Sequence, residues 1–437
     1  MFGYYLDLAL RSLKRNPVLT ALMITAIGFG IGTSMTSLSV SRAMSGDPIP
    51  EKSRQLFMVQ LDSWGPDKRG ERNEDGLDEN LSYIDAMALN DLRAGPRQTR
   101  IFSTYLNARA TDPTLKPVGM IAPAVDADFF PMFKAPFRFG GPWSRSDDQD
   151  GSLVVVISRK LNDQFFAGAN SVGKTLILEG ESYRVIGVLD KWPLVPRFYN
   201  LHVLPYGQID EIFIPFTRAI KAQASTTSGM SCQETTTASF EVRLRSECLW
   251  IQLWVELPAA ADVVNYRTVL NNYAAEQQRT GRFHWPPHTQ IRDVMQWLKY
   301  RHVVPNELGL LVLASFGFLF VCLMNAMGLM LARIIGRTQD ISVRRALGAS
   351  QTAIIGQCLV ETAVIGVLGA ILGLLLTTLG VLAMRAALAD DFAALAYLNA
   401  KAVGIEVLLA MAATIGAGLY PTWRAAHVEP ALQLKAE

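Results

Sequence analysis

The strongest candidate for chemistry in this sequence is the segment 168–175, GANSVGKT, which matches the G-x-x-x-x-G-K-[ST] pattern of nucleotide-binding loops. In such loops the backbone amides and the lysine hold phosphates, and this requires a strand before the loop and a helix after it. The flanking sequence predicts the reverse order, a helix over 158–167 and a strand over 174–178. We therefore expect that this segment does not bind nucleotide.

The histidines do not form a metal site by their spacing. His284 and His288 are spaced as two ligands on one helix, but Trp285-Pro286-Pro287 between them prevents a helix. No glutamate of the zinc-protease type accompanies them, and no serine or cysteine nucleophile motif occurs. Aromatic and basic residues are not clustered as in nucleic-acid-binding proteins. We expect no catalytic, cofactor-binding or metal-binding residues in this chain and no nucleic-acid partner.

The sequence contains four cysteines. Cys322 and Cys358 fall in apolar segments and are expected to be inert small side chains. Cys232 and Cys248 lie in a long polar stretch that we place outside the cytoplasm, where oxidising conditions favour a disulfide bond. Two buried free thiols are the alternative for this pair.

Apolar segments decide the architecture, because a membrane-spanning helix needs about 20 apolar residues. Four such runs cover 18–40, 308–331, 354–384 and 402–420. The first is too long for the core of a signal peptide, so we expect a retained helix. Basic residues flank the spans at Arg11, Lys14, Arg15, Arg333, Arg337, Arg344, Arg345, Arg424 and Lys435. The positive-inside rule therefore places both termini and the second connection in the cytoplasm.

These features predict the following order of segments. They are a cytoplasmic amphipathic helix at 1–17, span 1 at 18–46, a large outer insert at 47–301, a stalk end and span 2 at 302–333, a cytoplasmic segment at 334–353, span 3 at 354–386, a short outer loop at 387–401, span 4 at 402–420 and a cytoplasmic tail at 421–437. The amphipathic helix suits the lipid surface.

The insert has the composition of a soluble domain and predicts a mixed α+β fold. Strands are expected at 153–157, 174–178, 183–189, 211–216 and 240–245, and helices at 81–93 and 158–167.

Within the spans, two pairs of residues suggest specific roles. Gly28 and Gly32 form a small-xxx-small face that lets helices approach closely, although glycine is also common in membrane helices. Glu361 and Glu406 are carboxylates in apolar runs, which by default suggests function such as proton transfer. Both lie near the predicted ends of their spans, so interfacial placement is the alternative.

Three motifs resemble one family, the MacB/FtsX-type ABC permeases. The sequence from Asn325 to Ala349 reads N-x-x-x-L-x-x-A-R-x-x-x-R-x-x-x-I-x-x-R-R-A-L-G-A, and the run 418–434 resembles the family's C-terminal ending. The run 154–188, which ends in V-I-G-V, resembles the MacB periplasmic core domain. The resemblance implies an α-helical membrane protein with four transmembrane helices and a large α+β periplasmic domain inserted between helices 1 and 2.

The resemblance also implies a coupling helix that contacts a separate ATPase. It maps to 334–353, with contact residues Arg337, Asp340, Ile341, Arg344, Arg345, Ala346, Leu347, Gly348 and Ala349. The alternative is that these arginines only set topology. A stalk over 290–301 would enter span 2, and the chain itself is expected to carry no ATPase, with ATP and Mg²⁺ bound by two copies of the partner.

The family resemblance implies a location in the bacterial inner membrane and a second permease chain, identical or related. ATP-driven motion would pass to the periplasmic domain, a process called mechanotransmission. The expected use is efflux of peptides, antibiotics or toxins, with a periplasmic adaptor and an outer-membrane channel as further partners. Lipoprotein extraction, or regulation of a cell-wall hydrolase without transport, are the alternatives, and the cargo is not specified by the sequence.

Overall fold

The computed structural model divides the chain into two units, Met1–Gly46 with Val304–Glu437, and Asp47–Val303. We call them the membrane unit and the insert unit. The structure describes residues 2–65, 75–192, 194–201, 205–206, 210–227, 229–232, 239–338, 343, 347–387, 404, 408, 412, 415, 416 and 419.

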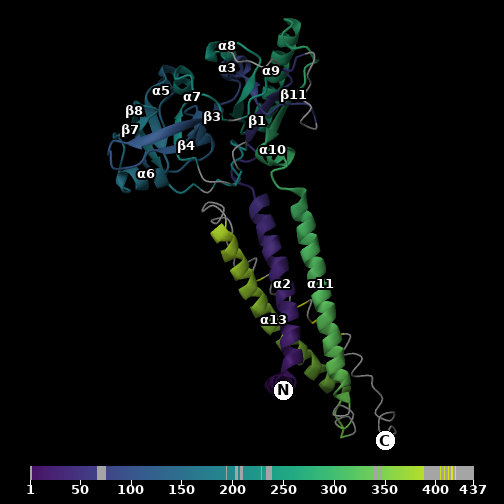
Figure 1. Cartoon of the computed structure of the whole chain (residues 1–437). Coiled ribbons are helices and arrows are strands. Elements are labelled where there is room, and N and C mark those ends of the chain that lie inside the picture. Colours follow the sequence, from purple (N-terminus) through teal and green to yellow (C-terminus); the bar gives the residue numbers. More distant parts are fainter. Residues whose placement is uncertain are drawn as a thin grey trace. The chain divides into compact units, whose positions relative to one another are not determined.

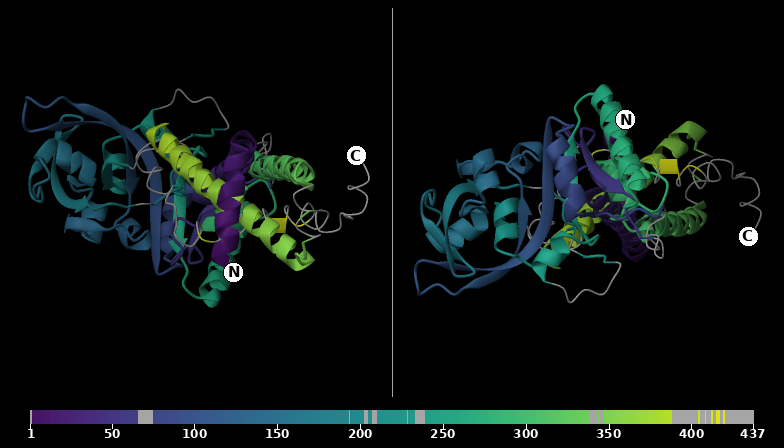
Figure 2. Two further views of the ribbon diagram at one scale, coloured as in Figure 1. Left: turned by 90° about the horizontal axis from the view of Figure 1, so that it is seen from below. Right: turned by 90° about the horizontal axis from the view of Figure 1, so that it is seen from above.

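The membrane unit consists of α1 (Phe2–Arg15), α2 (Pro17–Ser45), α11 (Asn306–Ile335) and α13 (Gln351–Ala387). Proline at the first position of a helix has a preset φ and no amide donor to lose, so Pro17 starts α2 directly after α1. Helix α2 packs against both α11 and α13 (Figure 1, Figure 2). Their shared apolar contacts include Ile27, Ile31 and Ile365.

Three helices are long and apolar enough to span a membrane, over Pro17–Ser45, Glu307–Ile335 and Gln351–Ala383. At 1.5 Å per residue the first two, of 29 residues each, extend about 44 Å, which exceeds a hydrocarbon core of about 30 Å. Of the predicted fourth span only residues 404, 408, 412, 415, 416 and 419 are described, whereas residues 388–401 before it and the tail after it lie outside the described residues.

The insert unit is built on a sheet of eleven strands. The strands are β1 (Leu56–Leu61), β2 (Leu81–Ser82), β3 (Arg97–Ala110), β4 (Val118–Val125), β5 (Phe137–Gly140), β6 (Val154–Ile157), β7 (Thr175–Leu178), β8 (Glu181–Leu189), β9 (Ile212–Pro215), β10 (Leu249–Glu256) and β11 (Thr289–Asp293). The order is β11-β1-β10-β3-β4-β9-β6-β8-β5, with β2 beside β10 and β7 beside β3 and β8. Most pairs are antiparallel, whereas β4 with β9 and β6 with β8 are parallel.

Eight helices accompany these strands in the described part of the insert unit. They are α3 (Tyr83–Leu92), α4 (Phe129–Met132), α5 (Arg145–Asp150), α6 (Arg159–Phe166), α7 (Phe216–Lys221), α8 (Phe240–Leu244), α9 (Ala260–Arg279) and α10 (Val294–Tyr300). The long strand β3, visible as the largest arrow in Figure 1, pairs with β10 at its start, with β4 along its middle and with β7 at its end.

Both faces of the sheet are buried at β1, β10 and the first half of β3, because alternate residues of these strands enter different cores, whereas the second half of β3 has one exposed face. In β1, Phe57 and Val59 belong to one core, and Leu56 and Met58 belong to the other. The second core is rich in aromatic side chains that meet edge to face, such as Phe129 with Phe133 at 4.7 Å between ring centroids. The insert unit is therefore an α+β domain with two cores.

Two expectations for the insert are wrong. Residues 240–245 are not a strand. Residues 240–244 form the short helix α8, which pairs with no strand of the sheet, and Val242 is 52% exposed. Residues 290–301 do not form a separate stalk. They form β11, which pairs with β1, and α10, whose Trp297 is fully buried and donates from Nε1 to the carbonyl of Phe198 at 3.0 Å.

Candidate functional site

The predicted ATPase contact begins where α11 ends. Arg337, Leu347, Gly348 and Ala349 are described, whereas Asp340, Ile341, Arg344, Arg345 and Ala346 lie outside the described residues. Leu347 is 83% exposed, which is unusual for leucine and leaves its side chain available to a partner. Gly348 has a φ of +97°, a conformation that favours glycine, so it lets the chain turn into α13.

Arg337 connects this segment to the other helices of the membrane unit. Its Nη1 donates to Ser12 Oγ of α1 at 2.6 Å and pairs with Glu361 of α13 at 3.3 Å. Arg333, one turn earlier on α11, donates to the same Ser12 Oγ at 2.9 Å. Gln357 donates to Glu361 at 3.4 Å. We call these five residues the arginine cluster.

The arginine cluster bears on the role of Glu361. This carboxylate is 9% exposed and has a cationic partner, so its place in an apolar run is accounted for by an ion pair between helices. Removing the cationic partner would leave Glu361 as an uncompensated buried charge, which is strongly destabilising. A displacement of Arg337 would therefore act on α1 and α13 together. Glu406 lies outside the described residues.

The two glycines of the first span lie at a close contact between α2 and α13. A Cβ atom added at Gly28 would lie 2.8 Å from Leu372, and one added at Gly32 would lie 2.8 Å from Leu376. In return, Ile27 and Ile31 of α2 fill the space left by Gly369 and Gly373 of α13. The sequence contained this second small-xxx-small pair, and the same pattern search applied to the third span would have found it.

We expect Gly32→Ile to weaken the contact between α2 and α13. Overpacking of this kind costs about 1–3 kcal/mol, and about 1.4 kcal/mol corresponds to a ten-fold change in an equilibrium. The readout is disulfide cross-linking of a Thr36→Cys, Gly380→Cys pair in a chain without Cys322 and Cys358. A Cβ at Gly380 would lie 3.6 Å from that of Thr36, within the range for a disulfide.

The control for this substitution is Gly317→Ile on α11, where an added Cβ meets nothing within 4 Å. Cross-linking should fall about ten-fold in Gly32→Ile and stay unchanged in Gly317→Ile. Equal cross-linking in both variants would mean that Gly28 and Gly32 have no specific packing role and are simply residues that are common in membrane helices.

The segment that matches the nucleotide loop is preceded by α6 and followed by β7, the order that the sequence predicted. Its backbone amides are used within the protein. The backbone amides of Gly168, Ala169, Gly173 and Lys174 donate to the carbonyls of Asn162, Phe166, Val185 and Ser171, in that order. The amide of Val172 donates to Asn170 Oδ1. The ammonium of Lys174 lies over the ring of Phe166 at 5.4 Å. A phosphate would find few free donors in this loop.

We accordingly expect Lys174→Ala to leave ATP hydrolysis by the assembled complex within about two-fold of the wild type. The measurement is phosphate release by the purified complex, with nucleotide binding to the full chain as a second readout. Tight ATP binding that disappears in Lys174→Ala would contradict both the loop geometry and the topology.

Cys232 and Cys248 form a disulfide bond in the structure, with an S–S distance of 2.00 Å. Ser231 and Leu249, one residue outside each cysteine, exchange backbone hydrogen bonds of 3.0 and 2.8 Å. The bond therefore fastens the segment that ends at Cys232 to the residue directly before β10. Cys322 and Cys358 are free.

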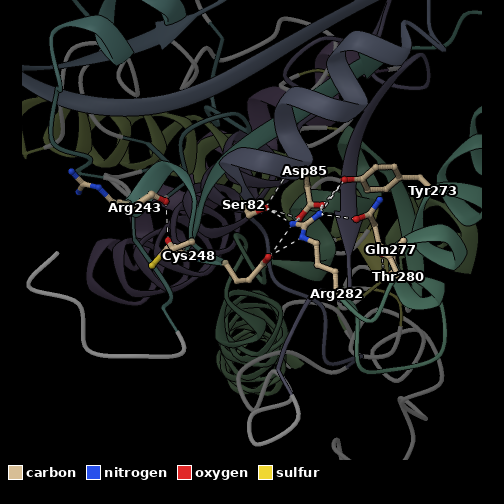
Figure 3. A network of polar contacts seen from close by, with 10 residues as sticks. Ser82, Asp85, Arg243, Cys248, Tyr273, Gln277, Thr280 and Arg282 are labelled. Atoms are coloured by element: carbon tan, nitrogen blue, oxygen red, sulfur yellow. Dashed lines mark hydrogen bonds and ion pairs between the residues drawn. The ribbon is translucent and has the colours of Figure 1, made fainter. Parts of the chain in front are cut away.

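A buried polar network lies beside this region and was not predicted (Figure 3). Arg282 pairs with Asp85 of α3 at 2.7 Å and with Glu247 at 2.8 Å. Tyr273 of α9 donates to Asp85 at 2.7 Å, and Ser82 donates to it at 2.6 Å. Burial and the Asp85 carboxylate raise the pKa of Tyr273, so this hydroxyl stays a donor. The network ties α3 and α9 to the strands and has no free group that suggests catalysis.

His284 and His288 are not brought into a metal site. Among the described residues, no group of three histidine, cysteine or acidic side chains converges as a metal centre would require.

Comparisons with known proteins agree with the two-unit architecture. Residues 20–271 match the family model described as MacB-like periplasmic core domain, and residues 312–430 match the FtsX-like permease C-terminal model. The macrolide export ATP-binding/permease protein MacB of Marinobacter nauticus is 22% identical over 98% of this chain and 60% of its own length. The pyoverdine export ATP-binding/permease protein PvdT of Pseudomonas savastanoi pv. phaseolicola is 22% identical over 97% and 58%.

This chain thus spans about 60% of the length of the curated relatives it matches. Among solved structures, the periplasmic region of MacB from Actinobacillus actinomycetemcomitans aligns with a TM-score of 0.37 and 15% identity, over 59% of this chain and 96% of that one.

Proposed function

This chain belongs to the MacB/FtsX-type family of ABC permeases, and we propose that it transmits ATP-driven motion of a separate ATPase subunit to its periplasmic domain. It is a multi-pass membrane protein, and its insert unit is a MacB-like periplasmic core domain. The observation that carries the proposal is the position of Arg337. This residue stands at the start of the cytoplasmic segment and bonds to both α1 and α13.

The covalent order of the chain supports the same route for the motion. Helix α2 ends at Ser45, directly before the insert unit, and α11 begins at Asn306, directly after it. A shift of the cytoplasmic segment would move α11 from its inner end, and the tight α2–α13 contact would make α2 move with α13. The insert unit would then receive two helix movements at once. Exposed Leu347 supplies an apolar contact for the ATPase.

The proposed process is efflux of peptides, antibiotics or toxins, and the names of the macrolide and pyoverdine exporters among the relatives support it. We further propose two ATPase copies, which bind ATP and Mg²⁺, a second permease chain, and both termini in the cytoplasm. A periplasmic adaptor and an outer-membrane channel would complete the assembly.

The test is affinity purification of the tagged full chain in mild detergent, followed by identification of the proteins that remain bound. An ABC ATPase should be recovered, and ATP hydrolysis should depend on the permease. An adaptor among the bound proteins supports efflux, whereas a cell-wall hydrolase or a lipoprotein carrier contradicts it and favours one of the alternatives. Recovery of a well-folded chain without any ABC ATPase would contradict the proposal as a whole.

A further inference from the structure

A polar cavity in the insert unit is unrelated to the coupling segment and to the disulfide. Its volume is about 120 Å³, and its walls come from the end of α3, the start of β3, the residues after β4, and α5. Charged side chains dominate these walls, as expected for a site that recognises a charged group and not an apolar one.

The floor of the cavity contains two carboxyl groups and one guanidinium group. Arg100 and Asp126 form a bidentate pair, with Nη2–Oδ1 at 2.6 Å and Nε–Oδ2 at 3.0 Å, and their side chains are 7% and 9% exposed. A second carboxylate, Asp148, is held by neutral donors, Trp143 Nε1 at 2.6 Å and the backbone amide of Ala127. Burial, and next the charge of Asp126, raise the pKa of Asp148 to about 7. One guanidinium therefore faces two carboxylates.

The rim of the cavity has the opposite balance. Arg145 pairs with Asp128 at 2.9 Å, and Arg97 pairs with Glu256 at 3.0 Å. Arg93 is the residue of left-handed conformation that ends α3. It is exposed, and its guanidinium has no ion pair within the described residues. Three guanidinium groups thus accompany two carboxylates. An excess of carboxyl groups inside and of guanidinium groups outside matches a ligand that carries both signs.

We propose that this cavity binds a small zwitterion of the amino-acid or short-peptide class, with its ammonium directed to Asp126 and Asp148 and its carboxylate to Arg93 and Arg97. An ammonium would supply a second cation to a floor where Arg100 alone faces both carboxyl groups. The planar guanidinium of Arg93 can hold a carboxylate through two parallel N–H donors. The volume admits the charged ends of such a ligand and little more, so selectivity would rest on charge separation. This site goes beyond the coupling function proposed above and does not depend on it.

The experiment titrates the full chain in detergent with L-alanine and with alanylalanine, by calorimetry or ligand-observed NMR. Propionate, which has only the carboxylate, and alaninamide, which has only the ammonium, are the single-charge probes. At least one zwitterion should bind saturably below about 10 mM, and both single-charge probes should bind about ten-fold more weakly, because a hydrogen bond to a charged group contributes about 1.5–3 kcal/mol.

Two variants assign the ends of the ligand. Arg93→Gln should weaken zwitterion binding about ten-fold without changing alaninamide binding, and Asp148→Asn should weaken alaninamide binding. Arg109→Gln, an exposed arginine at the far end of β3, is the matched control. The proposal is overturned if neither zwitterion binds, if a single-charge probe binds as tightly as the zwitterions, or if Arg93→Gln behaves like the control.

Discussion

Arg282→Gln is expected to destabilise the insert unit by about 3 kcal/mol, because it removes the only guanidinium that reaches Asp85 among the described residues. Asp85 is fully buried, and the loss of a cationic partner leaves a buried charge that water cannot solvate. Ser82 and Tyr273 would still donate to it, which keeps the expected cost at the lower end of the range for a broken buried pair.

The measurement is thermal unfolding of the full chain in detergent, followed by tryptophan fluorescence, since Trp250, Trp254 and Trp297 are buried in the insert unit. For a domain of this size, about 3 kcal/mol corresponds to a fall in the melting temperature of about 6–12 °C.

Arg279→Gln is the matched control, three residues away. Its ion pair with Glu276 joins side chains that are 77% and 50% exposed, and such solvent-screened pairs contribute little to stability. Equal shifts in the two variants would mean that the network in Figure 3 does not hold the domain together.

The three long apolar helices among the described residues could be predicted because a long apolar run has few other stable solutions. The strand β10 could not. Its sequence, LWIQLWVE, is buried at every position, so it has neither the alternation of a half-exposed strand nor the length of a span. Helix α9 was missed for the opposite reason: Tyr266, Leu270 and Ala274 are its buried residues, and so narrow an apolar stripe resembles a polar loop.

Among the candidate sites, local patterns could be found and long-range ones could not. Gly28 and Gly32 lie four residues apart on one helix, so sequence alone indicates a shared face. Arg100, Asp126 and Asp148 lie together only because β3, β4 and α5 come together in the fold, and their spacing in the sequence does not predict this. The same holds for Arg282, which pairs with Asp85 although the two residues are 197 positions apart in the sequence.

Arg344→Glu with Arg345→Glu is expected to abolish productive contact with the ATPase while leaving the chain in the membrane. Both arginines lie outside the described residues, so the expectation rests on the arginine-rich motif and on Arg337, which anchors that segment to α1 and α13. Loss of a desolvated charge contact at an interface costs about 2–5 kcal/mol, and reversal adds repulsion, so recovery of the ATPase should fall at least about thirty-fold.

The matched control is Lys14→Glu with Arg15→Glu, which makes the same change in charge at the exposed end of α1. If the arginines of the coupling segment only set topology, the two double variants should behave alike, and the accessibility of an introduced cysteine should report altered insertion. If they contact the ATPase, the control should retain the partner, and only Arg344→Glu with Arg345→Glu should lose it at normal membrane levels. Wild-type recovery of the ATPase and wild-type transport by the latter variant would remove this segment from the coupling route and leave the arginine cluster as a purely structural link between helices.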